Sequence, residues 1–247
     1  MMKIPRSHPR YQSLIQRHLL VDGMRKGFVA EAGLIAHGRG EAFDYLIGER
    51  TVEEAEYAES VSTGLLLLAE KPVISVNGNT AALISEGIVK LAELLNCKIE
   101  VNLFYRTEKR ERLIMEVLRS KGAEEVLGVG EMDYKFIPFL DSERGRVDPE
   151  GIWISDTVLV SIEDGDRTEA LIKMGKKVIA IDLNPLSRTS RHATITIVDN
   201  VVRAIPNMIE LARKMKDWKK SRIEKMISEF DNKENLENIT QRIRNAL

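Results

Sequence analysis

The chain has 247 residues, 43% of them hydrophobic, which is enough for the core of one large α/β domain. A formal net charge of -1 gives no electrostatic basis for nucleic-acid binding, and no apolar run approaches the roughly 20 residues that cross a bilayer. The N-terminal sequence lacks a signal-peptide core, so we expect a cytoplasmic protein without a membrane partner. One cysteine and four histidines without close ligand spacing predict neither an intramolecular disulfide nor a structural metal site.

The first seventy residues are predicted to be helical. Residues 9–26 carry apolar side chains spaced by three or four and form a first helix. Gly38 and Gly40 interrupt the next segment, and because each glycine costs roughly 1 kcal/mol in a helix interior, the pair predicts a turn or a close backbone approach. Thr51 and Glu54 have the spacing of a capping box, which predicts another helix before the first strand.

Residues 73–83 change from a strand pattern to a helix pattern. The run 73–76 is apolar and β-branched, as in a buried parallel strand, and helical spacing starts at Ala81. Between them lie Asn77, Gly78, Asn79 and Thr80. Capping by Asn79 or Thr80 is the simpler interpretation. Four small or amide-bearing positions at the amino end of a helix, in the crevice where open α/β sheets bind ligands, favour an anion site instead.

Strands and helices alternate along the rest of the chain. We expect strands at 98–104, 125–129, 158–162, 177–183 and 194–198. We expect helices at 107–121, at 166–174 with Asp166 as its cap, and at 201–215. This alternation predicts an α/β fold with a Rossmann-like, mostly parallel sheet and flanking helices. Within one structural unit we distinguish a helical N-terminal part (1–70), the α/β core (71–216) and a charged helical tail (217–247).

Two segments are expected to need cover. Residues 131–151 are irregular, with proline and glycine, and form a connection that could cover a site or a subunit contact. The tail carries a narrow apolar stripe that docks on the body of the molecule or on a second subunit, formed by Leu236, Ile239, Ile243 and Leu247. Both surfaces favour a homodimer.

The standard nucleotide-binding motifs are absent. There is no phosphate-binding P-loop, and the glycine pairs at Gly38 and Gly128 lack the third glycine of a dinucleotide fingerprint. Polar clusters instead follow two strands, one at residues 182–191 and one at Asp199 and Asn200. A strand-end aspartate can accept hydrogen bonds from ribose, and an arginine can bind phosphate through two parallel bonds. Ordinary turn chemistry explains either cluster alone, so both interpretations stay open.

Five longer stretches are more specific than these patterns. They read IPRSHPRYQSLIQRHLLVDG, GLIAHGRGEAFDYLIGE, SVNGNTAAL, AIDLNPLSRTS and IVDNVVRAIPNM, and they extend over nearly the whole chain. Together they resemble the archaeal phosphopantothenate synthetase family, also called 4-phosphopantoate:β-alanine ligase. The resemblance implies a cytoplasmic, homodimeric enzyme of coenzyme A biosynthesis. Such an enzyme uses ATP and Mg²⁺ to join 4-phosphopantoate to β-alanine, releasing AMP and diphosphate.

The resemblance also implies which residues bind ATP. Carried over by motif, the ATP contacts are Arg17, Arg39, Asp182, Leu183, Asn184, Arg188, Thr189, Asp199 and Asn200. Because negative charge accumulates on the phosphates during acyl-adenylate formation, Arg17, Arg39 and Arg188 are the expected catalytic residues. His37 and Glu41 flank Arg39 as candidate polar partners.

The 77–80 turn is left for the acyl substrate, because ATP already has its own contacts on other segments. A nucleotide-binding regulatory domain without catalysis is the alternative function, since the sequence contains no recognised catalytic nucleophile. An NAD-dependent dehydrogenase is disfavoured by the incomplete glycine pattern.

Overall fold

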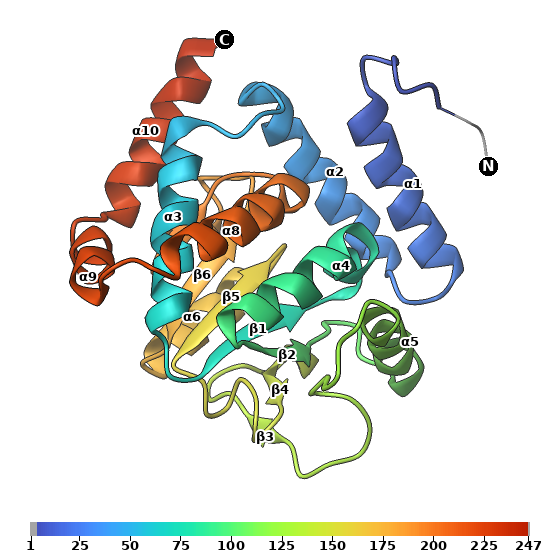
Figure 1. The fold of residues 1–247 in the computed structure, drawn as a ribbon. Coiled ribbons are helices and arrows are strands. Elements are labelled where there is room, and N and C mark those ends of the chain that lie inside the picture. The colour runs from blue at the N-terminus through green and yellow to red at the C-terminus, as the bar shows by residue number, and fades with distance from the viewer. Residues whose placement is uncertain (1–3, 247) are drawn as a thin grey trace.

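A computed structural model describes residues 4–246 of the chain. Within these residues five parallel strands form the central sheet in the order β2-β1-β5-β6-β7 (Figure 1). The strands are β1 (Pro72–Val76), β2 (Lys98–Val101), β5 (Thr157–Ser161), β6 (Lys177–Ile181) and β7 (Ile195–Ile197). A short antiparallel hairpin pairs β3 (Lys135–Phe136) with β4 (Arg146–Val147). The predicted α/β fold with a parallel, Rossmann-like sheet is confirmed.

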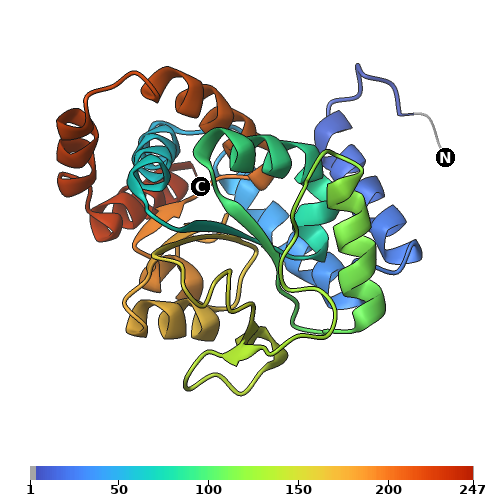
Figure 2. The ribbon, with the colours of Figure 1, turned by 60° about the horizontal axis from the view of Figure 1, so that its bottom comes forward.

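Helices cover both faces of the sheet (Figure 2). Successive residues of each strand point to opposite faces, so Ile74 and Leu159 join one core cluster, whereas Val73 and Val158 join the other. The first face is covered by α3 (Glu53–Leu68), α4 (Gly78–Leu95) and α8 (Val201–Met215). The second face is covered by α6 (Gly165–Lys173), by α7 (Arg188–His192) and by the segment that contains β3 and β4.

The remaining helices lie at the ends and one edge of the sheet. They are α1 (Tyr11–Arg25), α2 (Glu31–Leu46), α5 (Glu108–Arg119), α9 (Lys220–Ser228) and α10 (Asn232–Ala246). The predicted helical N-terminal part is confirmed, with α1 and α2 packed against each other and against α4 (Figure 1). Of residues 4–246, no helix has both the length and the apolar character of a membrane span.

The tail docks on the body of the same chain. Leu236 and Ile239 of α10 are buried against Ile47 and Val198, with Ile243 partly buried beside them. Leu247, the last residue of the predicted stripe, lies outside the described residues. Arg242 of α10 also pairs with Glu54 of α3: its Nη2 donates to Oε1 at 3.0 Å and its Nε donates to Oε2 at 3.1 Å. The part of the stripe that lies within residues 4–246 is therefore covered without a second subunit.

The prediction of a turn or a close backbone approach at Gly38 and Gly40 is wrong. The helix α2 continues through both glycines, and a Cβ at Gly40 would meet only the side chain of Leu183, at 3.5 Å. The same helix buries His37, Glu41 and Asp44, whose side chains face a polar cluster beneath α1 and α2. Tertiary packing of this face outweighs two helix penalties of roughly 1 kcal/mol each.

Two predicted helix caps are also wrong. Thr51 does not cap α3, because this helix begins after Val52 and has no side-chain cap. The hydroxyl of Thr51 instead donates to Asp199 Oδ2 at 2.7 Å. Asp166 lies inside α6, whose N-cap residue is Asp164. At Thr51 a long-range partner takes the polar side chain. At Asp166 the helix starts earlier than the local motif indicates.

The strand predicted at 125–129 is reduced to one parallel bridge between Glu100 and Leu127. Leu127 exchanges backbone hydrogen bonds with β2 through Val101 N and Ile99 O, both 2.9 Å long. Gly128 then adopts a φ of 74°, which turns the chain away from the sheet. The segment consequently contributes an edge contact rather than a sixth strand.

Candidate anion-binding site at the strand ends

The strand order creates a switch point between β1 and β5. The chain leaves β1 toward β2 on one side, whereas β5 leads to β6 and β7 on the other. Open α/β sheets bind ligands in the crevice outside the carboxyl ends of the strands at such a point. A cavity of about 210 Å³ lies there. Its walls are Ala30, Ala32, Gly33, Ala36, Arg39, Asn77, Gly78, Asn79, Leu103, Phe104, Tyr105, Arg110, Arg144, Ile162 and Asp164.

Three of the four predicted acyl-substrate residues, Asn77, Gly78 and Asn79, line this cavity. Asn77 is the N-cap of α4: its Oδ1 accepts from Thr80 N at 3.0 Å, and its Nδ2 donates to Ser161 O at 2.8 Å. These bonds tie the end of β1 to the end of β5. The Thr80 hydroxyl is fully buried between Asn77 Oδ1 and Ser161 Oγ, so Thr80 supports the turn from behind.

Gly78 and Asn79 connect the same turn to the N-terminal helices. A Cβ at Gly78 would collide with the carbonyl oxygen of Phe28, so this close backbone approach requires glycine. Asn79 Nδ2 donates to Gly33 O of α2 at 2.7 Å. The turn is therefore held rigidly, with the free amino end of α4 facing the cavity.

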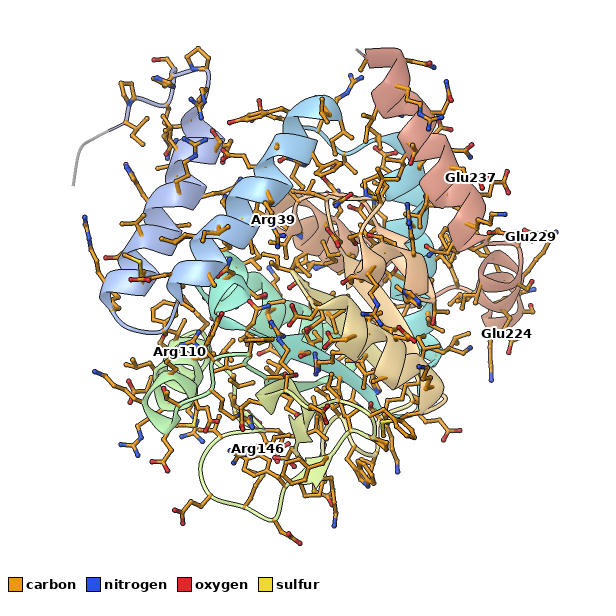
Figure 3. The ribbon with its side chains drawn as sticks, turned by 180° about the vertical axis from the view of Figure 1, so that it is seen from behind. Arg39, Arg110, Arg146, Glu224, Glu229 and Glu237 are labelled. Atoms are coloured by element: carbon orange, nitrogen blue, oxygen red, sulfur yellow. The ribbon has the colours of Figure 1, made fainter. Side chains whose placement is uncertain are left out.

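Three arginines line the cavity: Arg39 of α2, Arg110 of α5, and Arg144 of a 3₁₀ turn, η1 (Glu143–Gly145). Figure 3 labels Arg39 near the middle of α2 and Arg110 beside α5. Arg144 pairs with Glu163 and Asp164, each at 2.7 Å. No carboxylate within residues 4–246 pairs with Arg39 or Arg110. The cavity thus carries more positive charge than its own acids neutralise, which favours an anionic ligand.

A buried ionic network lies behind this wall. Glu163 accepts from Arg144 and also from Arg167, whose Nη1 is 2.5 Å from Glu163 Oε2. Arg167 is fully buried and donates to Ser75 Oγ on β1 at 3.3 Å. Asp164 lies at the cavity edge, where burial raises the pKa of its carboxyl and Arg144 opposes that rise. The network fixes the guanidinium of Arg144 at the cavity wall.

The predicted ATP contacts after β6 form a turn beside the cavity. Asp182 accepts from Ser187 Oγ at 2.5 Å and from Asn184 N at 2.9 Å, and burial raises the pKa of its carboxyl. Leu183 packs near Gly40 of α2, one residue from Arg39. The predicted ATP contacts and the cavity therefore meet at α2.

Arg188 and Thr189 extend this cluster toward β5. The hydroxyl of Thr189 donates to Glu163 O at 2.8 Å, which joins α7 to the backbone of the ionic network. The side chain of Arg188 passes over Gly165, where a Cβ would collide with it, and pairs with Glu169 at 2.5 Å. Both residues thus lie near the carboxyl ends of the strands, as the cavity does.

Asp199 and Asn200 follow β7 and lie in a buried polar cluster beneath α1 and α2. Asn200 Nδ2 donates to Gln16 Oε1 and to Asp44 Oδ2, both at 3.0 Å. Arg203 bridges Asp44 and Asp199, donating through Nε to Asp199 Oδ1 at 2.8 Å. Burial raises the pKa of Asp199, and Arg203 counteracts this effect.

Arg17 of α1 completes the predicted nucleotide residues. It forms an ion pair with Glu41 of α2, 2.7 Å from Nη2 to Oε2, and lies within hydrogen-bond distance of Tyr45. His37 is buried nearby, and its Nε2 has no hydrogen-bond partner within residues 4–246. Burial lowers the pKa of this imidazole. Glu41 is thus the partner of Arg17 rather than of Arg39.

Glu59 of α3 lies behind Asp199 and gives a prediction for pH dependence. Burial, and then the negative charge of Asp199, raise its pKa from 4.5 to about 8. Between these values the folded state keeps a proton that the unfolded state has lost. This contribution to stability is therefore complete below pH 4.5 and falls as pH rises toward about 8, by at most about 1.4 kcal/mol per pH unit.

Glu59→Gln is expected to remove this slope, because glutamine has no proton to lose and can still accept from Asn207, which donates to Glu59 at 3.0 Å in the wild type. Urea unfolding of both proteins at pH 5, 6.5 and 8 measures the effect. The variant should gain stability relative to the wild type as pH rises. A stability difference that stays constant over this range would contradict the prediction.

The sequence did not identify Arg110, Arg144, Glu163 or Asp164 as site residues. Arg110 lies in an amphipathic helix and Arg144 in the irregular 131–151 segment, so neither has a local functional pattern. The available signal was positional: Arg110 follows β2, and Glu163 and Asp164 follow β5, which are strand ends at the same edge as residues 77–80.

The fold and the site together define a Rossmann-like α/β protein with a positively charged crevice at the switch point and a polar cluster after the next two strands. The family model described as phosphopantothenate/pantothenate synthetase matches residues 54–246. The chain belongs to this family.

Three similar proteins are each named 4-phosphopantoate–β-alanine ligase. The relative from Thermococcus kodakarensis is 57% identical and the one from Thermococcus onnurineus 58%, each over 248 aligned residues that cover 100% of this chain and 94% of the relative. The relative from Methanosarcina mazei is 51% identical, covering 100% of this chain and 96% of the relative.

Proposed function

We propose that the protein is an ATP-dependent ligase that joins 4-phosphopantoate to β-alanine, forming 4'-phosphopantothenate for coenzyme A biosynthesis and releasing AMP and diphosphate. The observation that carries this proposal is identity of 51% to 58% along essentially the whole chain to relatives with that one name. The charge of the cavity supports it, because 4-phosphopantoate has two anionic ends.

In this reaction a carboxylate oxygen of 4-phosphopantoate attacks the α-phosphorus of ATP, and the bond to diphosphate breaks. The amine of β-alanine then attacks the acyl carbon of the adenylate, AMP leaves with the bonding electrons, and the amine loses a proton. The protein's part is to align the reactants and to stabilise charge on the phosphates. ATP lies on the residues after β6 and β7, and the acyl substrate lies in the cavity, at Asn77, Gly78 and Asn79, supported by Thr80.

Among the proposed catalytic arginines, Arg39 differs from the other two. Arg17 pairs with Glu41, and Arg188 pairs with Glu169. To contact ATP, each arginine must either break its ion pair or keep it while it also contacts a phosphate. Arg39 has no such partner within residues 4–246 and lies where the cavity and the β6 turn meet. It is placed to contact the α-phosphate and the attacking carboxylate together.

Mg²⁺ is expected to arrive with the ATP phosphates. Within the described residues, no group of three histidine, cysteine, aspartate or glutamate side chains could hold a metal ion. Asp182 and Asp199 accept several hydrogen bonds from the protein, so they offer at most single contacts. Mg²⁺ commonly binds in this way, through substrate phosphates, water and one or two carboxylates, and it offsets phosphate charge.

The test combines the purified protein with ATP, Mg²⁺, 4-phosphopantoate and β-alanine and identifies the nucleotide product. AMP and 4'-phosphopantothenate are expected, with no amide formed when β-alanine is omitted. ADP as the product would exclude the adenylate mechanism. Tight ATP binding without turnover would instead favour the alternative function, a nucleotide-binding regulatory domain.

We also propose that the protein acts in the cytoplasm as a homodimer, with the 131–151 segment at the contact. Phe139 is 92% exposed and Phe136 is 65% exposed, although both are large and apolar. Phe136 belongs to β3, and Phe139 follows it in the connection to β4. This hairpin lies at the bottom of the molecule in Figure 2. An apolar surface of this kind is typical of an interface. Sedimentation that shows a stable monomer at assay concentration would exclude the dimer.

A further inference from the structure

Arg110 is unusual among the cavity arginines because its guanidinium contacts only main-chain oxygens. Nη2 donates to Phe28 O at 3.1 Å, and Nη1 donates to Tyr105 O. The residue is half-buried, and no carboxylate between residues 4 and 246 forms an ion pair with it. Arginine side chains in such partly dry positions normally pair with an acid. Arg110 therefore holds a partly desolvated charge without a protein counter-charge.

The arginines at and behind this wall that do have acidic partners form one compensated network. Arg144 and Arg167 face two acids, Glu163 and Asp164, through contacts of 2.5 to 2.7 Å. Burial and the neighbouring Arg144 lower the pKa of Arg110. An anion placed in the cavity would oppose both effects on Arg110. Its negative charge would replace part of the lost solvation and would offset the repulsion between Arg110 and Arg144.

The two unpaired arginines lie on different sides of the switch point. Arg39 belongs to α2. The residue after it, Gly40, lies next to Leu183, which follows β6. Arg110 belongs to α5, which follows β2 at the opposite edge of the sheet. Figure 3 shows the two labelled side chains separated in the same way, Arg39 beside the α2 ribbon and Arg110 beside α5. Arg39 thus faces the nucleotide side and Arg110 the far side.

We propose that Arg110 binds the phosphate of the acyl substrate and thereby distinguishes the phosphorylated hydroxy acid from its unphosphorylated form. The inference rests on the proposed ligase function. The carboxylate must reach the α-phosphorus of ATP, so it takes the end of the cavity at Arg39. The phosphate, at the other end of the same small molecule, then takes the end at Arg110. The rigid amino end of α4 at Gly78 lies beside it.

The test compares Arg110→Gln with Arg112→Gln. Arg112 lies on the same helix, is exposed, and makes no side-chain hydrogen bond or ion pair with the described part of the chain. With 4-phosphopantoate, R110Q should lose roughly ten- to a hundredfold in kcat/KM, the loss expected for one charge-assisted contact. With pantoate, which has no phosphate, R110Q should match the wild type. The Kd for ATP should stay within about twofold in both variants.

Equal losses with pantoate and 4-phosphopantoate, or a R110Q protein indistinguishable from R112Q, would overturn the proposal while leaving the ligase function intact. A wild-type protein that forms no AMP would refute the ligase function instead. Calorimetric binding of 4-phosphopantoate to wild type and R110Q then decides the role of Arg110 without turnover. If thermal unfolding shows that R110Q does not fold, R110K, which keeps the charge but not the fork of donors, should show a smaller loss confined to 4-phosphopantoate.

Discussion

Arg39→Gln is expected to lower kcat/KM for AMP formation by about 10²- to 10³-fold, the usual loss when one donor to a developing negative charge is removed. Arg39 forms no ion pair within residues 4–246, and its charge acts at longer range on Asp182, where it opposes the rise in the pKa of that carboxyl. Arg39 lies where the cavity meets the turn after β6. The loss should appear mainly in kcat, because charge on the α-phosphate increases in the transition state.

Steady-state AMP formation with both substrates measures this effect, and Arg25→Gln is the matched control. Arg25 is an exposed arginine on α1 that makes no side-chain hydrogen bond or ion pair with the described chain. The thermal unfolding midpoint of R39Q should stay close to that of the wild type, because the substitution removes no hydrogen bond or ion pair within residues 4–246 and only a longer-range attraction to Asp182. A change in kcat/KM below threefold would refute a catalytic role for Arg39.

The fold was predictable because its strands carry a strong local signal. The apolar, β-branched runs at residues 73–76 and 158–162 correspond to β1 and β5, which are buried on both faces. Boundaries and caps were less predictable, since they depend on distant residues. The hydroxyl of Thr51, for example, meets Asp199 from a strand end 148 positions away. A local capping motif cannot include such a competitor.

The site was only partly predictable, for a related reason. Residues 77–80 are recognisable because strand, turn and helix follow one another in the sequence. Arg110 and Arg144 reach the same cavity from a helix and from an irregular connection, and neither has a pattern that separates it from a surface arginine. The two are brought together by the crossover from β1 to β2 and by the return to β5, which are properties of topology.

Glu163→Gln is expected to destabilise the protein by about 3 to 5 kcal/mol, because it removes the shared counter-charge of two buried arginines. The side chains of Glu163, Arg167 and Arg144 are only 2%, 0% and 8% exposed, respectively. Glutamine keeps the size of the side chain, so the loss measures charge rather than packing. Chemical unfolding at pH 7 gives the difference, and the thermal midpoint should fall by roughly 6 to 20 °C.

A matched control and a second-site change separate charge from other causes. Glu143→Gln removes an acid whose ion pair with Arg146 is 3.4 Å long and whose side chain is 55% exposed, so its effect should stay within about 1 kcal/mol. Adding Arg167→Met to E163Q removes the unpaired buried charge and should recover part of the lost stability. No recovery would mean that the loss comes from Arg144, which also pairs with Glu163 and keeps its charge in the double variant. Recovery of stability without recovery of activity would show that Arg144 needs Glu163 to hold its place at the cavity wall.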